Sequence, residues 1–134
     1  NKLKNQYEKL LIESILKDRN KNQVKDEIVN KIKIRFQKIQ GFPTKELRSI
    51  IDQGKKDLKE GIIIAYAVQE QKLGIAIGVT KELSKKFNAV DLIKIGSSVL
   101  GGKGGGGRND FAQAGGEKIE KIEDSYKEIL KKLI

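Results

Sequence analysis

A dense run of glycines followed by one arginine is the stretch of this sequence best suited to bind a ligand. Six glycines occur among the seven residues 101–107, with Lys103 between them and Arg108 directly after them. Glycine lets the backbone approach a ligand closely, and successive bare N–H groups can form a concavity that binds anions. A flexible linker has the same composition. The run is therefore either an anion-binding loop or a linker.

The residues after the run favour a binding loop. Arg108, Asp110 and Gln113 alternate with small and apolar residues, and a second glycine pair at 115–116 closes the segment. A linker does not need that order. We expect Asp110 to stabilise the loop by accepting hydrogen bonds from backbone N–H groups or from Arg108. Gln113 is predicted to take part in binding, because a buried amide between two alanines must find a partner.

The sequence excludes the common nucleotide-binding and catalytic motifs. Gly102, Gly104 and Gly107 formally satisfy GxGxxG, but that fingerprint needs a strand before it and a helix after it, the reverse of the order expected here. No Gly-Lys-Ser/Thr is present, and the chain has neither cysteine nor histidine. Thiolate or imidazole metal sites and the usual general base are therefore absent. We expect no cofactor, no metal site and no catalysis on this chain.

The segment 101–116, GGKGGGGRNDFAQAGG, resembles the signature of the C-terminal domain of alanyl-tRNA synthetases, part of the wider DHH-associated family. The resemblance extends less tightly back through residues 79–83 to about Ile32, and Asn109 departs from the family's usual proline. It implies a non-catalytic domain that grips the elbow of tRNA(Ala), where the D and T loops meet, and helps couple aminoacylation with editing. The family's ATP, magnesium and zinc belong to other domains of the parent ligase.

The resemblance also implies which residues contact tRNA. An arginine offers a planar fork for bidentate or stacking contacts, whereas a lysine acts as a point charge. In the structural alternative, Lys103 and Arg108 only neutralise the carbonyl end of the preceding helix. The predicted tRNA contacts are Gly101, Gly102, Lys103, Gly104, Gly105, Gly106, Gly107, Arg108 and Gln113.

Net charge supports a polyanionic partner. The 134 residues carry a formal charge of +10, and neutralising phosphates releases counterions and drives association. Single-stranded or duplex DNA would satisfy the same charge. The alternative is a general lysine bias, since 24 of the 28 basic residues are lysine.

No apolar run approaches the roughly 18 residues of a membrane span, so we expect a cytoplasmic protein without a membrane partner.

An N-terminal helical arm is predicted for residues 1–30, ahead of a globular domain over residues 31–134. The arm carries an amphipathic stripe, and a second short helix is expected at Val24, Ile28 and Val29. The resemblance implies that the stripe makes a homodimer, while docking on the chain's own globular part is the alternative. Because the chain begins without methionine, we expect it to be a piece of a longer protein. The predicted dimerisation residues are Leu3, Tyr7, Leu10, Leu11 and Ile15.

Residues 31–134 are predicted to form an α/β domain, a mixed sheet flanked by helices, with a glycine-rich loop at 101–107. Alternation predicts a strand from Ile32, and continuous apolar runs predict buried strands at 62–68 and 73–79. A short strand is expected at 110–114. Helices are expected over 44–58 with Thr44 as N-cap, over 89–100 with Asn88 as N-cap, and over 117–134.

Two other functions remain open from the sequence. The chain could be a dimerisation or interaction module without specific RNA contact. It could also be the nucleic-acid-binding lobe of a DHH-family phosphoesterase, although those relatives tend to carry a histidine where Arg108 stands.

Overall fold

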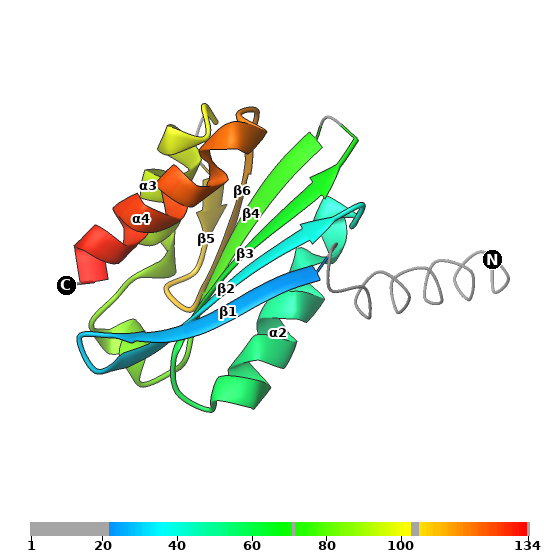
Figure 1. Cartoon of the computed structure of the whole chain (residues 1–134). Coiled ribbons are helices and arrows are strands. Elements are labelled where there is room, and N and C mark those ends of the chain that lie inside the picture. Colours follow the sequence, from blue (N-terminus) through cyan, green and yellow to red (C-terminus); the bar gives the residue numbers. More distant parts are fainter. Residues whose placement is uncertain (1–21, 71, 103–104, 134) are drawn as a thin grey trace, which may run out of the picture.

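The computed structural model describes residues 22–70, 72–102 and 105–133. Within them, six strands form one mixed sheet in the order β1-β2-β3-β4-β6-β5 (Figure 1). Strands β2 and β3 pair in parallel, and the other neighbouring pairs are antiparallel. The strands are β1 (Asn22–Val29), β2 (Ile32–Gln40), β3 (Ile62–Gln69), β4 (Lys72–Val79), β5 (Gly105–Gly107) and β6 (Phe111–Gly116).

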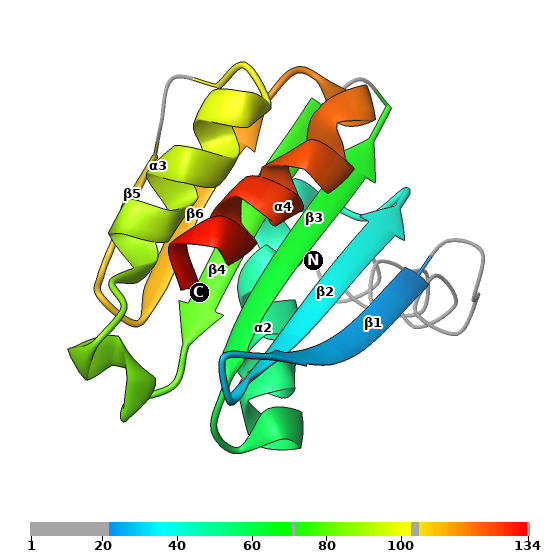
Figure 2. The same cartoon turned by 60° about the vertical axis from the view of Figure 1, so that its left-hand side comes forward.

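Helices cover both faces of the sheet. Helix α2 (Leu47–Leu58) lies on one face, and α3 (Ala89–Val99) and α4 (Ile122–Leu133) lie on the other (Figure 2). The predicted α/β class with a mixed, helix-flanked sheet is confirmed. The predicted arm helix and its dimerisation stripe lie outside the described residues. Short 3-10 helices are η1 (Thr44–Glu46), η2 (Leu83–Lys85) and η3 (Ile119–Lys121).

The two central strands, β3 and β4, are buried on both faces, as their continuous apolar sequences predict. Side chains alternate across a strand, so successive residues enter different cores. Burying one isoleucine or leucine side chain contributes roughly 1.5–3 kcal/mol, so the apolar side chains of these two strands contribute strongly to stability. In β3, the residues packed toward α3 and α4 are Ile62, Ile64 and Tyr66, and those packed toward α2 are Ile63, Ala65 and Ala67.

Two glycines let α2 lie close to the sheet. A Cβ atom at Gly54 would lie 2.7 Å from Cγ1 of Ile63, and one at Gly78 would overlap Ile51. Glycine at these two positions is therefore explained by packing.

The helix predicted at Val24, Ile28 and Val29 is wrong, because Asn22–Val29 form β1. A two-residue turn, Asn30–Lys31, joins β1 to β2 with φ angles of 51° and 66°, the geometry that suits an antiparallel hairpin. Val24 and Ile28 are four residues apart and imitate a helical stripe. They lie instead on one face of an edge strand and are 49% and 71% exposed.

The predicted caps differ in outcome. Thr44 does not cap α2; it begins the 3-10 turn η1, which leads into α2 at Leu47. Pro43 before it has an extended backbone, so the chain enters the helix through this tighter turn. Asn88 does cap α3, since its side-chain oxygen accepts a hydrogen bond of 2.9 Å from the N–H of Val90.

Candidate nucleic-acid interface

The first two glycines of the run end helix α3. Gly101 has a φ of 78°, a left-handed conformation that favours glycine. Its N–H donates to the carbonyl of Ser98 at 3.2 Å, and the N–H of Gly102 donates to the carbonyl of Ser97 at 2.9 Å. These two bonds form the Schellman motif that terminates many helices. The fold therefore requires Gly101 and Gly102 whether or not they contact RNA.

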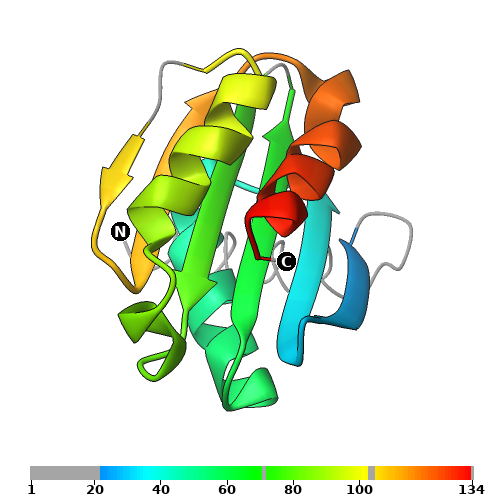
Figure 3. The ribbon, with the colours of Figure 1, turned by 90° about the vertical axis from the view of Figure 1, so that its left-hand side faces the viewer.

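The later glycines of the run form an edge strand. Gly105, Gly106 and Gly107 are paired in register with Ala114, Gln113 and Ala112 of β6. The prediction of a loop over residues 101–107 is therefore wrong for residues 105–107, which form a strand. As Figure 3 shows, β5 lies at one edge of the sheet and β1 at the opposite edge.

The glycines of this edge differ in how much space surrounds them. A Cβ at Gly102 would overlap the carbonyl oxygen of Gly115, one at Gly105 that of Gln113, and one at Gly107 that of Phe111. By contrast, a Cβ at Gly106 would have no atom of the described residues within 4 Å. Packing accounts for glycine at 102, 105 and 107, but it does not account for glycine at 106.

Gly106 is open on the face of the sheet that carries α2. Its partner Gln113 lies on that face, where its Nε2 donates to the carbonyl of Thr44 at 3.1 Å. The Gln113 amide, which is half-buried, thus has the partner that it was predicted to need, and this partner lies within the chain. Phe111 lies two residues earlier in β6, on the same face, and the guanidinium of Arg48 lies 5.5 Å from its ring centroid. This stacking distance suits a cation–π contact.

A hollow of about 130 Å³ lies where the β5–β6 turn meets α2. Three cationic and two anionic side chains line it, so its charge is net positive. Nζ of Lys55 donates to the backbone carbonyl of Asp110 at 3.0 Å, which ties α2 to the turn. The lining residues are Arg48, Asp52, Lys55, Arg108, Asp110 and Phe111.

Arg108 does not lie at the carbonyl end of α3. The alternative prediction, that Arg108 only neutralises that end of the helix, is therefore wrong. The edge strand carries the chain back along α3, and the N–H of Ala89 at the start of that helix donates to the carbonyl of Asn109. Arg108 is exposed at this turn, and its own N–H donates to the carbonyl of Phe111 at 2.6 Å. Lys103 and Gly104 lie outside the described residues.

The structure brings together residues that the sequence spacing does not connect. Arg108 shares a hollow with Arg48 and Lys55, which precede it by more than fifty positions and lie on a helix predicted only to pack. No motif marks these two cations. They become neighbours of Arg108 only because α2 packs beside β6 in the folded chain.

Neither a metal centre nor a membrane span is found in the described part of the chain. No group of three or more acidic, cysteine or histidine side chains there could hold a metal ion. None of its helices is both long and apolar enough to cross a bilayer. The expected lack of a cofactor stays a prediction.

With this geometry in place, comparison with known proteins gives the class: the chain belongs to the DHHA1 domain family, whose model matches residues 31–134. The chain is also similar to parts of two alanine–tRNA ligases. It is 46% identical to that of Parvibaculum lavamentivorans over 93 residues, which are 69% of this chain and 10% of the ligase. For the Hyphomonas neptunium ligase the identity is 39% over 103 residues, or 77% of this chain and 12% of the ligase.

A solved structure agrees with these relatives. The C-Ala domain of the Aquifex aeolicus alanyl-tRNA synthetase matches with a TM-score of 0.75 and 32% identity, over 80% of this chain and 96% of that domain. The resemblance predicted from the glycine signature is confirmed. The chain spans only about a tenth of the length of these ligases.

Proposed function

We propose that this chain is the non-catalytic, tRNA-binding C-terminal domain of an alanine–tRNA ligase, and that it grips the elbow of tRNA(Ala) with β5 and the hollow beside it. Its role is to hold one tRNA so that the charging and editing sites of the parent can share it. The names of the relatives and the net charge of +10 support RNA as the partner.

The open space at Gly106 is the observation that carries this proposal. The described residues give no steric reason for a glycine there, and the residue leaves a bare backbone on an exposed edge, two positions before Arg108. RNA loops are recognised by shape, by stacking and by contacts to phosphates rather than through a readable major groove. A side-chain-free strand that leads to the guanidinium of Arg108 suits such contacts.

The two arginines would act differently. The guanidinium of Arg48 lies over the ring of Phe111, and this contact would hold it in place to stack on an unpaired base, since guanidinium planes stack on bases. Arg108 is exposed at the turn and can donate a bidentate pair of hydrogen bonds to a phosphate. Lys55, already bonded to a backbone carbonyl, adds positive charge.

Binding of a tRNA(Ala) transcript to the full chain tests the proposal. Gly106→Leu should weaken binding at least tenfold, because the new side chain fills the space where RNA is expected. Arg108→Ala should cost about tenfold in affinity, the usual effect of losing one good charged contact, and lower the salt slope by about 1. Gln23→Leu, the same side chain placed on the opposite edge strand, is the matched control and should bind normally.

A footprint on the same tRNA tests the elbow specifically. The chain should protect nucleotides of the D and T loops from nuclease at low ionic strength, and unrelated single-stranded or duplex DNA should compete less well than tRNA. If no nucleotide at the elbow is protected and both site variants bind like the parent sequence, the proposal fails and an assembly role remains.

A further inference from the structure

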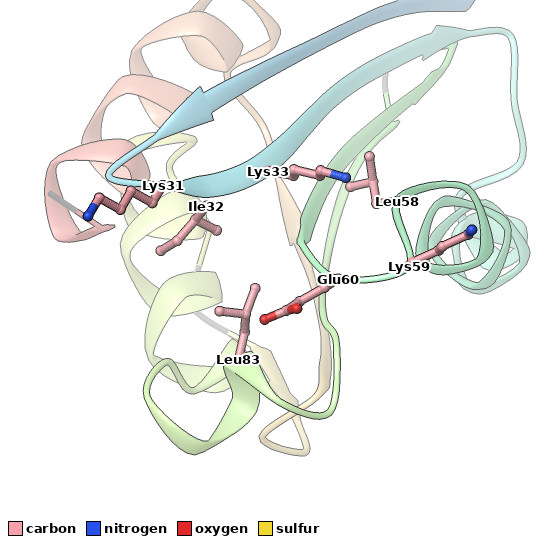
Figure 4. A pocket seen from close by; sticks show the side chains of 7 residues that line it. All are labelled: Lys31, Ile32, Lys33, Leu58, Lys59, Glu60 and Leu83. Carbon is pink, nitrogen blue, oxygen red and sulfur yellow. The ribbon is translucent and has the colours of Figure 1, made fainter.

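A second hollow, of about 310 Å³, opens at the end of the sheet where the β1–β2 turn, the end of α2 and η2 meet (Figure 4). Its apolar floor consists of Ile32, Leu58 and Leu83, of which the first two are each only 8% exposed. Lys31, Lys33 and Lys59 surround this floor together with one acid, Glu60. All four charged side chains are exposed.

The lysines around this hollow have no acidic partner among the residues that the structure describes. Among the described residues, no ion pair involves Lys31, Lys33 or Lys59. Glu60 points toward Leu83 rather than toward a lysine (Figure 4). Within the described part of the chain, these exposed ammonium groups are therefore available to an anionic ligand.

Two of these lysines occupy backbone positions where glycine would be the relaxed residue. Lys31, with a φ of 66°, is the second residue of the hairpin turn, a position that usually holds glycine after asparagine. Lys59 has φ 65° and ψ −51°, and the N–H of Glu60 donates across it to the carbonyl of Leu58 at 2.7 Å, which makes it the centre of a rare, strained γ-turn. A strained residue at a surface hollow suggests a functional use for its side chain.

The lysines spread out rather than converge. Figure 4 shows Lys31 directed toward α4, Lys33 toward Leu58, and Lys59 along the side of α2. This spread does not suit a single small anion, which needs its donors around one point. It suits a chain of phosphates that passes the hollow and meets one amine after another.

The hollow is linked to the glycine edge through the last turn of α2. Lys55 lines the hollow beside Arg108, and Lys59 lines the lysine-rimmed one. Lys59 directly follows the last residue of α2, and its N–H donates to the carbonyl of Lys55 at 2.9 Å. A strand that leaves Arg108 and follows α2 toward its C-terminal end therefore passes Lys55 before it reaches Lys59.

We infer that the lysine-rimmed hollow (Lys31, Lys33 and Lys59 around Ile32, Leu58 and Leu83) is a second RNA contact, which holds backbone phosphates of the strand that leaves the glycine edge. The inference rests on the proposed function for the identity of the polyanion. It adds a contact surface at the end of the sheet, away from the glycine run.

Replacing the two strained lysines by glycine separates binding from folding. In the double variant Lys31→Gly/Lys59→Gly of the full chain, the affinity for a tRNA(Ala) transcript should fall several-fold, and the slope of log K against log salt should fall by about 2, one for each lost phosphate contact. The melting temperature should stay the same or rise, because glycine relaxes both turns. Lys94→Gln/Lys127→Gln, which removes two exposed charges from α3 and α4, is the matched control and should change the slope little.

An unchanged affinity and salt slope in the glycine double variant would overturn the inference, as would an equal loss in the control. If the double variant does not fold, Lys33→Gln, which leaves both turns intact, is measured instead. Its affinity should also fall, and its salt slope should fall by about 1, because one charge is removed. Arg108→Ala keeps the two proposals distinct. Weaker binding in Arg108→Ala alone supports the proposed function and removes this inference, whereas weaker binding in the lysine variant alone supports the second contact and removes the glycine edge as the grip.

Discussion

Strands β1 and β5 form the two edges of the same sheet, but different interactions hold them. Side-chain hydrogen bonds link β1 to its neighbours. Arg35 of β2 donates to Asp26 of β1 and to Asp57 of α2, each at 2.8 Å. The hydroxyl of Tyr126 in α4 donates to Glu27 of β1 at 2.6 Å. The three glycines of β5 have no side chains, so backbone pairing and close packing hold that edge. One edge is thus sensitive to charge and the other to volume.

The largest effect is expected from added volume at β5. Gly105→Ala and Gly107→Ala should each lower the free energy of unfolding by about 1–3 kcal/mol, because the new methyl group overlaps backbone atoms of β6 and the strand must shift. Chemical denaturation followed by circular dichroism measures the change. Gly106→Ala is the matched control, and equal destabilisation by all three variants would show that tight packing does not distinguish these positions.

A smaller effect is expected from removing charge at β1. Arg35→Met should cost about 1 kcal/mol, the upper range for partly exposed ion pairs, while Lys25→Met, which removes a lysine 3.6 Å from Glu27, should change little. The hydrogen bond from Arg35, followed by that from Gln53, lowers the pKa of Asp57. A lowered pKa stabilises the fold above the ordinary pKa, and this stabilisation is lost as pH falls through the lowered value. Acid titration of stability should therefore be flatter in Arg35→Met, and parallel curves would contradict this role.

The smallest effect is expected from the tyrosine that ties α4 to β1. Burial, followed by the hydrogen bond to Glu27, raises the pKa of Tyr126 above its ordinary value of 10. The stabilisation from a raised pKa is complete below pH 10 and is lost as pH rises through the higher value. Tyr126→Phe should cost about 0.5–1 kcal/mol at neutral pH, the net worth of one hydrogen bond, and stability should then fall less above pH 10. Thermal unfolding at several alkaline pH values measures this, and identical alkaline profiles would contradict it.

The sequence predicted correctly those elements whose apolar residues are buried or whose ends carry a capping residue. The continuous apolar runs of β3 and β4 and the Asn88 cap of α3 have local causes that the sequence reveals. The failure at β1 has a physical reason. Val24 and Ile28 are exposed, so their spacing carries no information about a core, and only the turn at Asn30–Lys31 sets the register of the hairpin.

The candidate site was predictable only in part. The glycine run and Arg108 are visible in sequence, but pairing with β6 turns three glycines into a strand, and glycine has no side-chain pattern that could reveal it. The cations on α2 become partners of Arg108 through packing between distant segments. The left-handed φ of Lys31 and the γ-turn at Lys59 also depend on tertiary context, because nothing in local spacing marks a lysine for a strained backbone.

The shortness of β5 affects how the protein behaves in concentrated solution. An edge strand exposes unpaired N–H and C=O groups, and a long, flat edge recruits extended segments of other molecules into growing aggregates. With three residues, β5 offers too few ladder bonds to hold a foreign strand, while the charge of +10 makes approaching copies repel one another. A variant with a longer β5 should therefore depend on this charge repulsion to stay soluble. It should precipitate at a lower salt concentration than the parent sequence, because salt screens the repulsion.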